Sequence, residues 1–414
     1  MITINRNRKN YYCILIFLLF YTNFFNIINI PISSHLYNVF LWILALMNFA
    51  ISFLYTKGKI GKEVTFAVPY LIYIYTTQII ICYYSVYQYN QSFSNVLKCA
   101  GYYSYLLLYF GVMIAIKEIG FGKMLQFFNT IAAVCILVIL LHAIFFNIFG
   151  IRLFQIRGIG IRDGRMRNSL GVFACIFFAY TTANIVYQKQ KLKNIIWLII
   201  GLIALFYTDM TRIKELAVIL EIGCIYFFSN YSKKQKINKI LILLLGIFIV
   251  IIFKDSFQNL FNMFSVDRTV NSNANSTIAR LYAMEYFSKF TEKNPLMGMG
   301  WIFPSNNRLR NIWSGPQNIA FFDDLGIIGQ YYRLGIIGLI SYIVLILRML
   351  YIIVKYKKSD IYKACLIGLF IYAIITAVSL NIFDFQRIVL VPIYMAIFEY
   401  AHRNKNKLEG DLKV

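Results

Sequence analysis

Long apolar stretches follow one another along almost the whole chain, and no other feature constrains the fold as strongly. Apolar residues fill 60% of the 414 positions, which is more than the interior of a soluble domain can bury. A helix that crosses a ~30 Å hydrocarbon layer needs roughly 20 such residues. The sequence therefore predicts an all-α polytopic membrane protein with about twelve transmembrane helices. The expected spans are residues 11–30, 36–55, 65–87, 96–116, 126–149, 170–187, 195–208, 213–229, 238–253, 333–354, 361–380 and 388–402.

The basic residues indicate which ends of these spans lie in the cytoplasm. A formal net charge of +24 would suit a nucleic-acid-binding protein, but the lysines cluster in short intervals between alternate spans. Residues 57–62, 189–193, 233–239 and 355–363 are such intervals. Cytoplasmic loops of membrane proteins carry this excess of positive charge. We therefore expect both termini in the cytoplasm and no nucleic-acid partner.

One long polar interval interrupts the apolar pattern and divides the chain into three parts. Residues 1–253 hold nine expected spans, and residues 254–332 form a large external loop. Residues 333–414 hold the last three spans and a cytoplasmic tail. Within the loop, the stretch STIARLYAMEYFSKF has helical spacing. We expect Asn294-Pro295 to end that short helix, because the residue before a proline avoids helical backbone angles.

Arginine, unlike lysine, gathers on the side that is expected to be external. The loop between the fifth and sixth spans carries Arg152, Arg157, Arg162, Arg165 and Arg167. Lysine is a hydrated point charge, whereas the planar guanidinium of arginine binds phosphate through two parallel hydrogen bonds and tolerates partial burial. The cluster therefore indicates an anionic ligand on this side. Contact with lipid headgroups is the alternative explanation.

Further arginines stand where polar segments meet the spans. Arg212 follows Thr211 at a span entrance, where Asp209 and Glu215 are close enough in sequence to neutralise it. Arg280 opens the helix of the large loop. An ionisable residue at membrane depth is a candidate functional residue. Glu221, nine residues after Arg212, should therefore face protein or water rather than lipid.

The sequence LGIIG occurs twice, at 325–329 and at 334–338. Nine residues at 100° each place the two copies on opposite faces of one continuous helix, where small residues let helices approach closely. Arg333 would then share a face with Gly329 and form one wall of a phosphate site. The alternative is a helix–helix contact, with Arg333 extending outward to the interface.

The sequence offers no pattern for a metal or a cofactor. All seven cysteines lie in or at the edge of expected spans, and His35, His142 and His402 are far apart. Zinc sites, metalloprotease helices and phosphate-binding glycine loops each need a spacing that is missing here. We expect neither a metal ion nor a cofactor.

The order of these features resembles one family of bacterial membrane enzymes. Arg167-Asn168 with Leu170-Gly171 opens a span, Thr211-Arg212 opens another, Arg280 precedes Asn294-Pro295 and Gly298-x-Gly300, and Asp324-x-Gly326 precedes the last glycine-rich helix. This layout resembles the O-antigen and capsular polysaccharide polymerases, which form one broad group with the O-antigen ligases. The resemblance covers most of the chain in layout, although each motif is short.

The resemblance implies a metal-independent glycosyltransferase of the bacterial plasma (inner) membrane. Its substrates would be two undecaprenyl-pyrophosphate-linked oligosaccharides, a donor and an acceptor, with a chain-length regulator as a possible protein partner. Because the departing pyrophosphate needs preorganised positive charge, we expect Arg280 and Arg212 to hold it. The attacking hydroxyl needs a base, for which Asp324 is the first choice. The expected supporting residues are Arg162, Arg165, Arg167, Arg333, Asp323 and Glu285, all of them gathered around one cavity.

Two other functions fit part of the sequence. Ligases of this group carry a histidine late in the large loop, where this chain has Gln317-Asn318, so the polymerase is favoured and the general base is open. A flippase or other transporter of lipid-linked oligosaccharides would also use about twelve spans and buried arginine. Transporters commonly show an internal repeat of spans, and we detect none.

Overall fold

The computed structural model describes residues 8–28, 34–55, 66–154, 156, 160–162, 165–187, 190–209, 211–229, 274–316 and 318–404. Nearly all of these residues lie in helices, and the strands among them are β1 (Gly160–Arg162) and β2 (Arg165–Arg167), which form one antiparallel hairpin. The span expected at 238–253 and the first part of the large loop lie outside the described residues. The helical fold class is confirmed for the described part of the chain.

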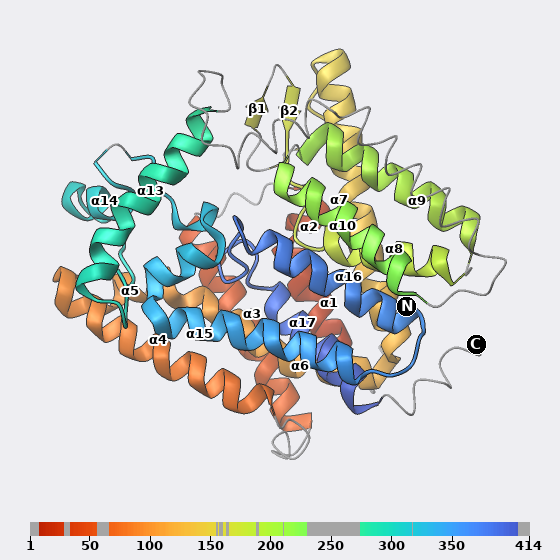
Figure 1. The fold of residues 1–414 in the computed structure, drawn as a ribbon, viewed down its shortest axis with the longest axis horizontal. Helices are drawn as coiled ribbons and strands as arrows, with labels where there is room; N and C mark the ends of the chain where they lie inside the picture. The colour runs from red at the N-terminus through yellow and green to blue at the C-terminus, as the bar shows by residue number, and fades with distance from the viewer. Residues whose placement is uncertain are drawn as a thin grey trace.

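The helices follow one another in the order that the sequence predicts (Figure 1). They are α1 (Lys9–Tyr21), α2 (Asn23–Asn26), α3 (Ser34–Tyr55), α4 (Ala67–Tyr89), α5 (Phe93–Ala100), α6 (Leu108–Ile119), α7 (Phe121–Phe149), α8 (Ala174–Val186), α9 (Lys191–Ala204), α10 (Arg212–Phe228), α13 (Ala274–Lys293), α14 (Asn307–Ser314), α15 (Gly326–Lys355), α16 (Ile361–Thr376) and α17 (Leu390–Arg403). The loop helix α13 ends directly before Asn294-Pro295, as expected.

Six helical segments within the described ranges are long and apolar enough to cross a membrane. They are His35–Tyr55, Ala67–Tyr89, Phe93–Ile119, Phe121–Phe149, Lys191–Asp209 and Gly326–Lys355. Three shorter apolar helices, Lys9–Tyr21, Ala174–Val186 and Ile361–Thr376, pack among them. A chain with this set of helices is suited to a bilayer, because each helix satisfies its own backbone hydrogen bonds.

Polar contacts at the two ends of α1 connect it to the end of α6 and to the turn that precedes α17. At one end, the Glu118 carboxylate accepts hydrogen bonds from the Asn10 side chain at 3.0 Å and the Tyr11 backbone N–H at 3.0 Å. At the other end, the Tyr21 hydroxyl donates to the backbone oxygen of Gln386 at 2.7 Å. We call the second end, which holds Tyr21 and Gln386, the site end. The start of α1 and the end of α6 therefore lie at the same end of the helices.

Helix α15 is broken at Gly335, where the backbone has φ 65° and ψ −161°. The two helical hydrogen bonds that would cross the break are replaced by bonds to the turn at residues 294–300. Backbone N–H groups of Met299 and Gly300 donate to the oxygens of Tyr332 and Arg333 at 2.9 and 2.7 Å. In return, the N–H of Ile336 donates to the oxygen of Pro295 at 2.9 Å. The turn thus satisfies the polar groups that the break exposes, which an apolar surrounding requires.

This break corrects the expectation for the LGIIG repeat. The two copies do not lie on one continuous helix, because the first glycine of the second copy, Gly335, has a positive φ that ends helical rotation. A Cβ atom on Gly335 would lie 2.2 Å from the Leu296 oxygen, and one on Gly298 would lie 2.6 Å from the Tyr332 oxygen. Gly335 and Gly298 therefore allow the turn to pack closely against α15. They do not form a contact between two helices.

Two other departures from α-helical geometry lie at the site end. The span expected at 96–116 contains a 3-10 segment, Gly101–Leu107, between α5 and α6. The span expected at 195–208 ends in a π-helical segment, Leu205–Asp209. Such interruptions re-aim side chains, and they are frequent at functional sites. Here the 3-10 segment carries Tyr102 and Tyr103, and the π-helical segment carries Asp209.

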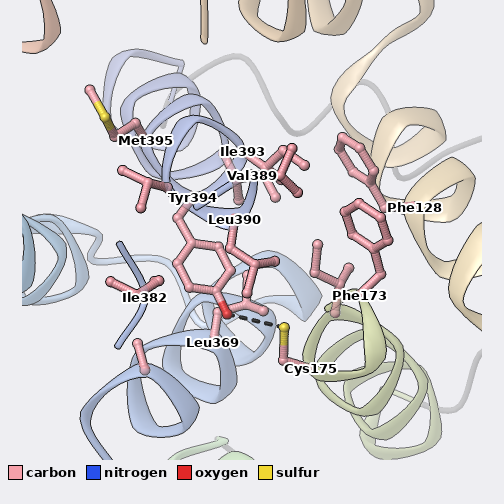
Figure 2. Close-up of a cluster of buried hydrophobic side chains, with 14 of the residues drawn as sticks. Phe128, Phe173, Cys175, Leu369, Ile382, Val389, Leu390, Ile393, Tyr394 and Met395 are labelled. Atoms are coloured by element: carbon pink, nitrogen blue, oxygen red, sulfur yellow. Dashed lines mark hydrogen bonds between the residues drawn. The ribbon is translucent and has the colours of Figure 1, made fainter. Parts of the chain in front are cut away.

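The largest buried cluster joins α7, α8, α16 and α17 (Figure 2). Phe128 and Phe173 stack with ring centroids 6.2 Å apart, beside Leu390 and Ile393. The Tyr394 hydroxyl is the polar group shown within this cluster, and it lies 3.1 Å from the sulfur of Cys175. This packing fixes α17 against α8 and so holds the turn that precedes α17.

Candidate functional site

A cavity of about 130 Å³ lies at the site end, between the broken helix α15 and the 3-10 segment. Its walls are mainly aromatic, and Arg333 and Asp323 are its charged groups among the described residues. We call it the Arg333 cavity. Its principal lining residues are Tyr102, Trp301, Trp313, Phe322, Asp323, Arg333 and Phe385.

Arg333 is held from several sides within this cavity. Its Nη2 lies 3.1 Å from Asp323 Oδ1, and its Nη1 lies 3.4 Å from the Tyr102 hydroxyl oxygen. The guanidinium carbon lies 4.8 Å from the ring centroid of Phe322 and 5.4 Å from that of Trp301. A cation over aromatic faces is stabilised by the ring quadrupole, so the charge of Arg333 is retained although the residue is only 8% exposed.

Helix α4 fixes the orientation of Trp301. The indole Nε1 donates to Gln78 Oε1 at 2.9 Å, and the backbone N–H donates to Ser85 Oγ at 2.8 Å. Gln91 Nε2 donates to the Trp301 backbone oxygen at 2.6 Å. Two hydrogen bonds to α4 and one from Gln91, just beyond its end, hold Trp301 in place, and the bond to Gln78 fixes the ring. The aromatic wall is therefore preorganised before any ligand enters.

A chain of polar side chains connects the cavity to the turn at residues 381–387. Asn381 Nδ2 donates to Gln330 Oε1 at 2.8 Å, and Gln330 Nε2 donates to the Tyr103 hydroxyl at 3.2 Å. The Tyr103 ring stacks on Phe383 with centroids 6.3 Å apart. Sequence reasoning missed this network. The sequence feature that could have revealed this network is the presence of Gln330 and Asn381 within otherwise apolar stretches.

A second, smaller cavity of about 50 Å³ lies on the other side of the same turn. We call it the Lys214 cavity. Lys214 Nζ lies 2.8 Å from Ser169 Oγ and 2.9 Å from Asp209 Oδ2. Arg387, which also lines this cavity, forms an ion pair with Asp384. Lys214, two positions after Arg212, was not among the predicted site residues.

Asp209 organises the polar side of the Lys214 cavity. Its carboxylate accepts a hydrogen bond from the Leu170 backbone N–H at 3.0 Å and another from the Thr211 hydroxyl. Arg167 donates from Nε to the Asp209 backbone oxygen at 3.0 Å and from Nη2 to Thr211 Oγ1 at 3.2 Å. Asp209 is 1% exposed. The hydrogen bonds that its carboxylate accepts offset the cost of burying its charge.

The turn at 381–387 separates the two cavities. Phe385 lines the Arg333 cavity, whereas Gln386 and Arg387 line the Lys214 cavity. Two basic cavities therefore lie next to each other at the site end, and each has an arginine or lysine paired with an aspartate.

The predicted site residues divide between these cavities and the surface. Arg333 and Asp323 meet in the first cavity. Arg167 binds Asp209, the partner of Lys214 at the second cavity. Arg212 is the first residue of α10 and is half-buried. Asp324, the first choice for the base, is exposed, although its neighbour Asp323 faces Arg333. Glu285 is exposed on α13 and pairs with Lys289 at 3.4 Å. Arg162 and Arg165 face each other in the register of the β-hairpin.

Arg280 lies on the same face of α13 as Phe287. Seven residues separate it from Phe287, so the two share one face, about 10 Å apart along the helix. The Phe287 ring stacks on Phe322 with centroids 3.8 Å apart, and Phe322 contacts Arg333. Nearby, Tyr286 donates to the Asn311 backbone oxygen at 3.0 Å, and burial raises the pKa of Tyr286 so that it stays a neutral donor. Arg280 itself is half-buried.

No protein-family model matches the chain, and no curated protein matches it in sequence. The residues of the two cavities themselves therefore indicate which chemistry the site can perform. Aromatic faces bind the apolar faces of sugars, guanidinium groups bind phosphates, and a half-exposed carboxylate can accept a proton. Within the described residues, no group of three or more His, Cys, Asp or Glu side chains is arranged to hold a metal ion.

Proposed function

We propose that the chain is a metal-independent membrane glycosyltransferase that polymerises undecaprenyl-pyrophosphate-linked oligosaccharides into O-antigen or capsular polysaccharide. The observation that carries this proposal is the Arg333–Asp323 pair that lines an aromatic cavity. The cavity combines the three groups that sugar transfer from a lipid diphosphate needs: a cation, a carboxylate and aromatic walls. In this proposal the chain spans the bacterial plasma membrane about twelve times, and the site end faces outward.

The proposed reaction uses the pair in two roles. The acceptor hydroxyl oxygen attacks the anomeric carbon of the donor, and the bond from that carbon to the pyrophosphate oxygen breaks. Arg333 stabilises the charge that develops on the departing pyrophosphate. Asp323 accepts the hydroxyl proton. It is favoured over Asp324 because it faces Arg333, whereas Asp324 is exposed.

The second cavity suits a reaction with two carrier lipids. A polymerase must hold a donor and an acceptor at once, each with its own pyrophosphate. The Lys214 cavity offers Lys214 and Arg387 on the opposite side of the 381–387 turn from Arg333. Adjacent binding of two substrates converts an encounter in solution into a reaction within one complex.

A transporter of the same lipid-linked oligosaccharides is the second candidate. The buried carboxyl of Glu221, at a depth where charge is costly, is typical of proton-coupled transporters as well as of other functional sites. Deletion of the gene distinguishes the two functions. Loss of a polymerase leaves single repeat units on the cell surface, whereas loss of a flippase leaves none.

The experiment for the proposed function complements the deletion with Arg333→Ala and with Arg308→Ala. Arg308 is an exposed arginine of α14 and serves as the matched control. Removing one preorganised donor to a developing charge lowers the rate by about 10²–10³-fold, so Arg333→Ala should give single repeat units and Arg308→Ala a full glycan ladder. A full ladder from an Arg333→Ala protein present at normal levels would contradict the proposed role.

A further inference from the structure

Glu221 lies in the interior of α10, fully buried, and both of its carboxylate oxygens lack a hydrogen-bond partner among the described residues. Glu399, another buried carboxylate of this chain, is instead paired with a cation. Glu399 binds Arg348 through both oxygens, at 2.6 and 2.9 Å. An ionised carboxylate is buried with such a partner. The contrast indicates that Glu221 is held in a different protonation state.

The neighbours of Glu221 come from three other helices. A Cβ atom on Gly368 of α16 would lie 3.1 Å from Glu221 Oε1 and 3.2 Å from Ala179 of α8, so the carboxyl sits where α8, α10 and α16 meet. Among the residues that the structure describes, the titratable groups that interact electrostatically with it are Cys175 of α8, Cys365 and Tyr372 of α16, and Tyr394 of α17. None of these groups is a cation, so none compensates a negative charge.

Two of these neighbours connect Glu221 to the Lys214 cavity. Tyr372 and Tyr394 line that cavity, and the Tyr394 hydroxyl also donates toward Cys175 (Figure 2). On α10 itself, Lys214 precedes Glu221 by seven residues, so the two share a face and lie about 10 Å apart along the helix. The Lys214 side of the cavity and the carboxyl therefore lie along one side of α10, and Tyr372 and Tyr394 line the cavity from α16 and α17.

We propose that Glu221 is a proton-binding site that is protonated at rest and exchanges its proton with the Lys214 cavity past Tyr372 and Tyr394. A neutral carboxyl removes the cost of a buried charge without a partner. Tyrosine hydroxyls both donate and accept, so they pass a proton between a cavity and a buried acid. The inference is independent of sugar transfer, because it concerns the protonation of one carboxyl and its access to one cavity.

The first experiment treats the full-length protein in lipid nanodiscs with dicyclohexylcarbodiimide. This apolar reagent takes the proton of a carboxylic acid on one nitrogen while the carboxyl oxygen adds to its central carbon, and the adduct retains every atom of both reactants. Mass spectrometry of the digested protein should place an adduct on Glu221 and none on Glu399. An adduct on Glu399 instead of Glu221 would overturn the proposal.

The second experiment records infrared spectra of the same sample in H₂O and D₂O. A protonated Glu221 gives a carboxylic-acid C=O band that shifts in D₂O and disappears in Glu221→Gln, while Glu399→Gln leaves it unchanged. The shift should develop at least tenfold more slowly when Tyr372 and Tyr394 are both replaced by Phe. Absence of the band, or a band that D₂O does not shift, overturns the proposal. If Glu221→Gln does not fold, the adduct map of the unmodified sequence decides the outcome.

Discussion

The carboxylate of Asp323 lies 3.1 Å from the guanidinium of Arg333, and the two differ in their access to solvent. The Asp323 side chain is 49% exposed, whereas that of Arg333 is 10% exposed. The acidic member of this cavity-lining pair is therefore the one that solvent reaches more easily. An anionic ligand that enters the cavity competes with Asp323 for the same cation, which would free the carboxylate to act as a base.

Two adjacent aspartates give a matched test of that base. Asp323→Asn should reduce polymerisation by about 10²-fold or more, the usual contribution of a positioned base. Asp324→Asn should leave it within about twofold of normal, because Asp324 is exposed. Glycan chain length on gels and polymer yield per cell measure both. Equal losses from the two variants would show that the orientation of Asp323 toward Arg333 has no catalytic consequence.

Arg280 and Arg212 test whether the site extends beyond the Arg333 cavity. Arg280→Ala or Arg212→Ala should shorten or abolish the glycan ladder if each supplies the preorganised positive charge for the diphosphate that the sequence resemblance implies. Arg310→Ala, on the exposed face of α14, is the control. Ladders of normal length from both variants would restrict the diphosphate site to Arg333 and Lys214.

The glycines of the interlocked turn are predicted to be indispensable for stability. Gly335→Ala and Gly298→Ala each place a methyl group against backbone atoms, at 2.2 and 2.6 Å, at positions with positive φ. Backbone strain alone costs about 1–3 kcal/mol, and the steric clash adds to it.

Thermal unfolding in detergent should show lower midpoints for both glycine variants. Gly223→Ala on α10 is the control, because a Cβ atom there meets nothing within 4 Å and helix propensity favours alanine by about 1 kcal/mol. An unchanged midpoint for Gly335→Ala would mean that the turn and α15 are not interlocked.

The ion pair between Arg348 and Glu399 tests the energetics of burial at the other end of the helices. Arg348→Ala leaves Glu399, whose side chain is 2% exposed, as a buried anion without its partner. Breaking such a pair costs about 3–5 kcal/mol. The double variant Arg348→Met/Glu399→Leu should recover most of that loss, because the charge is removed as well. A double variant as unstable as the single one would assign the loss to packing instead of charge.

The sequence by itself determined the features that depend on near neighbours. Apolar stretches of sufficient length predicted helices α3, α4, α7 and α15, because a lipid-facing backbone must bond within its own helix. Asn294-Pro295 predicted the end of α13 for an equally local reason. The choice of arginine over lysine at position 333 indicated a cation that tolerates burial. The number of spans and their orientation stay predictions.

Only the tertiary structure decided how distant residues meet. The break at Gly335 forms because a turn some 35 to 40 positions earlier in the chain supplies the hydrogen bonds that α15 gives up. Tyr102, Trp301 and Asp323 surround Arg333 only after residues more than 200 positions apart are packed together. Local pattern could not separate Asp323 from Asp324, since the difference between them is which one reaches Arg333. Residue type therefore set the chemistry that is available, and packing set which groups meet, because hydrogen bonds and ion pairs act only over a few ångströms.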